Sequence, residues 1–153
     1  MARMRTSRRN MERYNTIVQD TSVSTSMETI EIHESDSAET LQRVRINIEL
    51  YDNDTNAGGD QLAWVLCTQP KGVNVETPSF TQTEDRNVGM TEIDRGNVVV
   101  FTGGTGLATI GRIERDIKVQ RKMKAGDKLV FNYQANSTTD IDMVGVIYAW
   151  YKE

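Results

Sequence analysis

The stretch "LQRVRINIELY", residues 41–51, decides the fold class of this chain. Aliphatic residues occupy every second position from its fourth residue onward, between charged or polar ones; they are Val44, Ile46, Ile48 and Leu50. In an extended chain these side chains share one side, whereas a helix would need them three and four positions apart. The pattern predicts a strand with one face in the protein interior and the other in solvent.

Further strands are indicated along the chain. The segment "KLVFNYQA", residues 128–135, repeats the alternation, and "KAGD" before it suits a turn with Gly126 where a positive φ is needed. The segments "QLAWVLCTQ", residues 61–69, and "DIDMVGVIYAWYK", residues 140–152, are apolar on both faces. Each is predicted to be a central strand, or a strand whose outer face meets another subunit.

Weaker strand patterns occur at residues 15–19, 23–32, 97–101 and 112–120. In the second of these the alternation slips between Met27 and Ile30, as a β-bulge would cause. The isoleucines of the last segment also fit helical spacing, but alternation favours a strand there. Residues 70–96 have little periodicity, which is typical of long loops or a short helix.

Composition supports an all-β fold. Of the 153 residues, 37% are hydrophobic and 26% charged, which suffices for one core in one domain. Thr, Asn, Asp, Val and Ile are abundant while Ala and Leu are scarce, so intrinsic preference leans toward strands and turns. About eight strands separated by polar loops predict an antiparallel sandwich, with a jelly roll as the preferred topology.

A short basic arm is expected ahead of the domain. Residues 1–13 are predicted to form the arm and residues 14–153 the jelly roll. The arm contains one acidic residue, Glu12, and five arginines: Arg3, Arg5, Arg8, Arg9 and Arg13. Guanidinium groups pair bidentately with phosphates, so the arm is predicted to bind nucleic acid without sequence preference. A solubilising tail and a mitochondrial transit peptide are the alternatives.

No enzyme is expected. The loop "TGGTG", residues 102–106, together with Tyr148 and Lys152, resembles the cofactor loop and catalytic pair of short-chain dehydrogenases. A dinucleotide fold needs several βαβ units after the glycine turn, but 47 residues follow Gly106. The tyrosine and lysine also fall in a segment with strand character rather than one turn apart on a helix. The glycines are therefore interpreted as a loop between strands.

Metal ligands are also scarce. His33 and Cys67 are the only residues of their kinds, so zinc clusters and histidine triads lack members, and Cys67 is expected to be a buried, inert thiol. The stretch "DNDTNAGGD", residues 52–60, resembles the start of a calcium loop but has Ala57 where glycine is required. A hairpin loop is preferred, with a weak calcium site as the alternative. We therefore predict no catalytic residues, no metal site and no cofactor.

Three features together resemble the single-jelly-roll capsid proteins of small circular single-stranded DNA viruses and of satellite viruses. They are the start "MARMRTSRRNMERY", the strand "ETLQRVRINIELY", and the closing pair "RKMKAGDKLVF" and "MVGVIYAWYKE". The resemblance implies a closed icosahedral shell of identical subunits, located in the virion, whose arms point inward. The arm arginines are then expected to bind packaged nucleic acid, with Arg43 and Arg45 as possible additions.

A jelly-roll recognition module is the alternative function. A lectin-like or fibre-tip domain would hold a ligand in its polar loops, and its arm would be incidental. Neither function predicts a membrane partner, because the longest apolar run, "MVGVIYAWY", is far shorter than the ~20 residues of a membrane helix.

Overall fold

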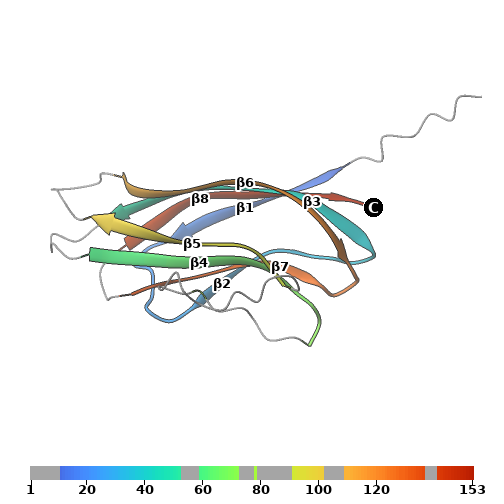
Figure 1. The fold of residues 1–153 in the computed structure, drawn as a ribbon, viewed down its shortest axis with the longest axis horizontal. Helices are drawn as coiled ribbons and strands as arrows, with labels where there is room; N and C mark the ends of the chain where they lie inside the picture. The colour runs from blue at the N-terminus through green and yellow to red at the C-terminus, as the bar shows by residue number, and fades with distance from the viewer. Residues whose placement is uncertain (1–10, 53–58, 73–77, 79–90, 102–108, 137–140) are drawn as a thin grey trace, which may run out of the picture.

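Antiparallel strands arranged in two four-stranded sheets make up most of the chain that the structure describes (Figure 1). The computed structural model describes residues 11–52, 59–72, 78, 91–101, 109–136 and 141–153, and the structural statements below concern these residues. Their eight strands are β1 (Glu12–Asp20), β2 (Glu28–Glu34), β3 (Glu39–Asp52), β4 (Gly59–Gln69), β5 (Glu92–Phe101), β6 (Thr109–Met123), β7 (Lys128–Ala135) and β8 (Ile141–Lys152).

The strand order is that of a jelly roll. The first sheet has the order β1-β8-β3-β6 and the second has the order β2-β7-β4-β5. The first four strands pair with the last four in reverse order: β1 with β8, β2 with β7, β3 with β6, and β4 with β5. The chain is therefore one long antiparallel ribbon folded over into two layers, which Figure 1 shows edge-on. The predicted eight-stranded antiparallel sandwich is confirmed.

The core fills the space between the two sheets. The alternation predicted for residues 41–51 is confirmed, because Val44, Ile46, Ile48 and Leu50 are all buried. Facing them from the second sheet, Trp64 of β4 stacks on Phe131 of β7 with ring centroids 5.6 Å apart. The turn before β7 contains Gly126 at φ 90°, as its sequence predicts.

The strand β4 is buried on both faces, as its sequence predicts for a central strand. Its inner side chains join the main core, while Val65 and Cys67 on the other face form a second buried cluster with Val130 of β7. Cys67 is thus a buried thiol, as expected. The expected contact with another subunit is not needed to explain the apolar outer face of this strand.

The strand β8 is central in the first sheet, and its outer face is open. Met143, Ile147 and Tyr151 point into the core, whereas Val144 on the opposite face is 46% exposed. Gly145 leaves no room for a side chain beside β3, since a Cβ there would be 2.2 Å from the carbonyl oxygen of Asn47. The register of this strand pair therefore depends on the missing side chain.

Three local features differ from the sequence-based expectations. The irregularity in β2 lies between Glu31 and His33, later than expected. Strand β5 begins at Glu92 rather than at residue 97. Its first residues lack apolar alternation, but they pair with β4, and an ion pair joins Glu92 to Arg95. Strand β1 begins at Glu12, so the end of the expected arm is part of the sheet.

Candidate nucleic-acid interface

The outer face of the first sheet brings together three arginines and two aromatic rings that are distant in sequence. They come from β1, β3 and β8: Arg13, Arg43, Arg45, Tyr148 and Trp150. In the strand register, Trp150 is flanked by Arg13 on one side and Arg43 on the other. Tyr148 is in register with Arg45. We call these five residues the basic-aromatic face.

Strand alternation explains why these side chains point outward. Tyr14, Val44 and Tyr151, each next in sequence to a member of the face, point inward, where the last two are fully buried and Tyr14 packs against the core. Successive side chains of a strand point to opposite faces, so the charged and aromatic neighbours are turned toward solvent. The same alternation that turns apolar side chains into the core therefore turns these five side chains to the outer face.

Guanidinium groups lie over both rings, which are partly exposed. The guanidinium carbon of Arg13 is 5.6 Å from the centre of the Tyr148 ring, and that of Arg43 is 5.2 Å from the centre of the Trp150 ring. The ring centroids are 6.0 Å apart. Such cation–π contacts orient the positive groups above a continuous aromatic surface. The face thus combines groups that pair with phosphates and groups that stack on bases.

One of the three arginines is held by a carboxylate. Nε of Arg43 donates to Oδ1 of Asp116 on β6 at 2.6 Å, and Nη2 donates to Oδ2 of the same carboxylate. The hydrogen bonds from Arg43 lower the pKa of Asp116, and those to Asp116 raise the pKa of Arg43. Both side chains are about half exposed, so the pair faces solvent with the rest of the basic-aromatic face.

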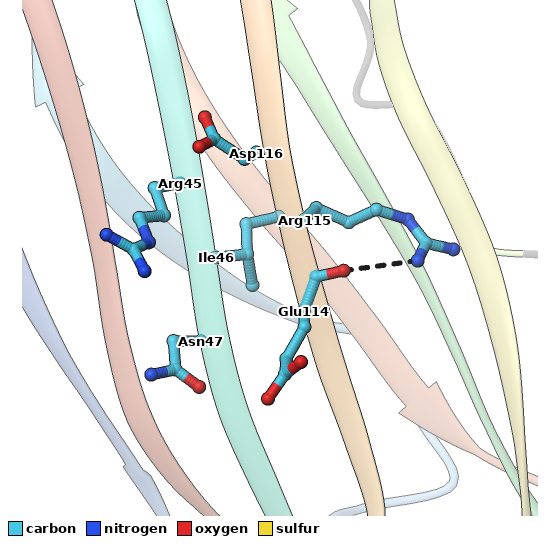
Figure 2. Close-up of a pocket in the computed structure, with 6 residues that line it drawn as sticks. All are labelled: Arg45, Ile46, Asn47, Glu114, Arg115 and Asp116. Carbon is cyan, nitrogen blue, oxygen red and sulfur yellow. Dashed lines mark hydrogen bonds between the residues drawn. The ribbon is translucent and has the colours of Figure 1, made fainter.

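A hollow of about 300 Å³ lies beside this pair, between β3 and β6. Figure 2 shows Arg45 and Asn47 on the β3 side and Glu114 and Asp116 on the β6 side, so charges of both signs line it. Arg115 extends the other way, toward β5, where it pairs with Asp94 at 3.2 Å. The hollow is polar and open, and it extends the basic-aromatic face toward the edge of the sheet.

The predicted nucleic-acid-binding residues are distributed unevenly. Arg13, Arg43 and Arg45 come together on the basic-aromatic face. The remaining four, Arg3, Arg5, Arg8 and Arg9, lie outside the described residues, as do residues 53–58 of the possible calcium loop and the glycine loop 102–108.

Sequence reasoning missed the two rings of the face. The segment of Tyr148 reads as a strand that is apolar on both sides, and Tyr148 with Lys152 resembles a catalytic pair. Both residues lie on strand β8 and not on a helix. Alternation along the strand could have revealed them, because Tyr148 and Trp150 lie at even positions, on the face opposite to the buried Ile147 and Tyr151.

Two partly buried clusters of titratable residues join strands of the two sheets. The Tyr133 hydroxyl is 2.7 Å from Oδ2 of Asp20 and 2.9 Å from Oε2 of Glu28. The hydrogen bond with Asp20, followed by burial, raises the pKa of Glu28. In the other cluster, His33 Nε2 lies 2.7 Å from Oε1 of Glu39.

Neither cluster has the composition of a metal site. In the part of the chain that the structure describes, no group of three His, Cys, Asp or Glu side chains is placed to hold a metal ion. No helix among these residues is long and apolar enough to cross a membrane.

Comparisons with known proteins assign the chain to no family. No protein-family model and no curated protein matches it. Similar solved structures include dimeric latent PorU from Porphyromonas gingivalis, with a TM-score of 0.44, 8% identity, and coverage of 92% of this chain and 13% of that one. They also include the VP2 subviral particle of infectious bursal disease virus, with a TM-score of 0.29, 10% identity, and coverage of 89% and 33%. The chain thus spans a small part of each.

Proposed function

We propose that this chain is the shell protein of a virion, which assembles with copies of itself and binds nucleic acid without sequence preference. The observation that carries the proposal is the basic-aromatic face of the first sheet. It lies next to the start of β1, the strand into which the arginine-bearing residues 1–10 lead. The arginines of residues 1–10 are therefore close in sequence to Arg13, the first arginine of the face.

The chemistry of the face suits a flexible polyanion. Guanidinium groups release counterions from phosphates, which gives affinity without reading bases. The Tyr148 and Trp150 rings offer flat surfaces on which any base stacks, and this contact is likewise tolerant of sequence. Hydrogen-bond readout of base edges in duplex DNA needs a helix or ribbon that enters a groove, which a broad sheet face does not supply.

The proposed self-association draws on the apolar part of the same sheet. Ile17 of β1 is 80% exposed and lies in register with Val146 of β8, next to the 46% exposed Val144. Apolar side chains that lie together on a surface are typical of protein–protein contacts. In a shell, repeated contacts between identical subunits close by rotational symmetry.

The nucleic-acid proposal predicts the salt dependence of binding. Affinity for an unstructured oligonucleotide falls with salt by a slope of about 0.7 per neutralised phosphate in a log–log plot. Replacing Arg13 and Arg45 by glutamine is expected to lower that slope by roughly 1.4, and deleting residues 1–10 by roughly 3. Fluorescence anisotropy of a labelled oligonucleotide over a salt series measures both.

A matched control separates site from net charge. Lys71 and Lys124 lie at exposed turns away from the basic-aromatic face, so their double replacement by glutamine removes the same charge elsewhere. That variant is expected to keep a slope close to the wild type. Equal losses in the two double variants would show that the face has no special role, and an unchanged slope after deletion of residues 1–10 would refute the role of the arm.

A further inference from the structure

The bidentate contact between Arg43 and Asp116 distinguishes this arginine from the others of the basic-aromatic face. Both ends of the carboxylate accept from the guanidinium, through Nε and Nη2. Among the ion pairs of the described residues, none involves Arg13 or Arg45. The guanidinium that lies over the Trp150 ring is therefore also the one already occupied by an acid.

A carboxylate and a phosphate compete for the same part of a guanidinium. Both anions accept two parallel hydrogen bonds from the planar fork, so a phosphate that takes the Nε edge must displace Asp116. The displaced carboxylate then stays beside the phosphate, and like charges at that distance repel. Phosphate binding is thus weakened in two ways: the Arg43–Asp116 hydrogen bonds must break, and the freed Asp116 carboxylate then repels the phosphate.

We propose that Asp116 is an intramolecular competitor that lowers the affinity of the basic-aromatic face for phosphates by occupying Arg43. The inference rests on the proposed nucleic-acid binding and adds a means of regulating it at the same site. Its partner is any phosphodiester or phosphomonoester able to reach Arg43. Binding becomes favourable when several phosphates engage the face together, because the other arginines then offset the loss of the Asp116 contact.

The surrounding charges keep Asp116 in its competing, ionised form. Arg43 lowers the pKa of this carboxyl first through its hydrogen bonds and then through its charge, and the charges of Arg45 and Lys118 act in the same direction. Neutralisation of Asp116 therefore requires acid below the usual range for aspartate. At neutral pH the competition persists, and mutation is the direct means of removing it.

The test compares two variants that each remove one negative charge from the outer face of β6. Asp116→Asn keeps the shape of the side chain and frees Arg43, whereas Glu114→Gln changes a carboxylate two residues away that contacts Arg112 at 3.8 Å. With an unstructured oligonucleotide, D116N is expected to bind roughly twofold to fivefold more tightly, within the range typical of one exposed ion pair. Its salt slope is expected to steepen by about 0.7, and E114Q to change both quantities by less than half as much.

A double-mutant cycle ties the gain to Arg43. In an Arg43→Gln background, Asp116→Asn is expected to give no gain beyond that of Glu114→Gln. A gain that persists without Arg43, or equal gains in D116N and E114Q, would overturn the inference, because Asp116 would then act only through its general charge. Absence of oligonucleotide binding in every variant would sink the proposed function itself. Circular dichroism spectra check that all variants keep the fold.

Discussion

At the scale of single residues, the polar contacts of this protein join positions that no local pattern connects. Arg43 and Asp116 are separated by 73 residues, and Tyr133 lies 113 residues from Asp20. The sequence indicated that Arg43 and Arg45 face outward, because alternation determines the side of a strand. It gave no sign of their partners, because these depend on which strands pair and in what register.

The contact between the carboxyl groups of Asp20 and Glu28 makes stability depend on pH. The hydrogen bond with Asp20 and burial raise the pKa of Glu28, so the folded protein binds this proton more tightly than the unfolded chain, where glutamate titrates near 4.3. The resulting stabilisation is complete below about pH 4 and is lost as the pH rises through the folded-state pKa. Glu28→Gln cannot ionise and keeps a hydrogen-bonding group in place.

Stability of E28Q relative to the wild type is therefore expected to increase from pH 4 to pH 8, by about 1 kcal/mol, the size of one hydrogen bond. Urea unfolding at a series of pH values measures the difference. Glu34→Gln, at an exposed position of the same strand, is expected to follow the wild type at each pH. If the free energy of unfolding had the same pH dependence in E28Q and in the wild type, the raised pKa of Glu28 would be refuted.

At the scale of elements, strands with regular alternation were predictable and those held by distant pairing were not. Strand β3 alternates clearly, and its buried face matches the prediction. In β7, Leu129, Phe131, Tyr133 and Ala135 are buried as predicted, but Val130 and Asn132 on the other face are buried too. Strand β5 starts at Glu92, although the sequence "EIDRGN" lacks alternation. This segment is extended because it pairs with β4. The bulge in β2 likewise reflects its pairing with β7, which a single segment does not encode.

The close approach of β8 to β3 at Gly145 gives a test of this pairing. A Cβ at this position would lie 2.2 Å from the backbone oxygen of Asn47 and 2.6 Å from the Cα of Ile48, so the two strands must separate to accept it. Gly145→Ala is expected to destabilise the protein by about 3 kcal/mol, the upper end of the usual cost of overpacking, measured by thermal or urea unfolding. Val144→Ala, one residue away on the open face, is expected to cost less than about 1 kcal/mol. Similar losses at both positions would contradict the observed register.

At the scale of the whole molecule, the reversed pairing of the first and last four strands defines the topology. The sequence favoured a jelly roll only through the number of strands and their polar loops, since strand order depends on contacts between distant segments. The basic-aromatic face is a product of that order. Three strands from the beginning, middle and end of the chain must become neighbours before its five residues meet.

Assembly is the prediction that belongs to this scale. Electron microscopy of the purified full-length protein is expected to show uniform closed particles. Charged substitution of Ile17, as in Ile17→Asp, is expected to reduce particle formation while leaving the circular dichroism spectrum unchanged, because this side chain is 80% exposed. Monomers or trimers in place of particles would favour a recognition module instead.

The position of β1 has a mechanical consequence. This strand is at the edge of its sheet, and it is paired along nine successive positions, from Glu12 opposite Tyr151 to Asp20 opposite Met143. Hydrogen bonds between antiparallel strands run perpendicular to the strand axis. Tension applied to the N-terminal residues along that axis would therefore load the whole ladder in shear, so that its rungs share the force rather than break one after another.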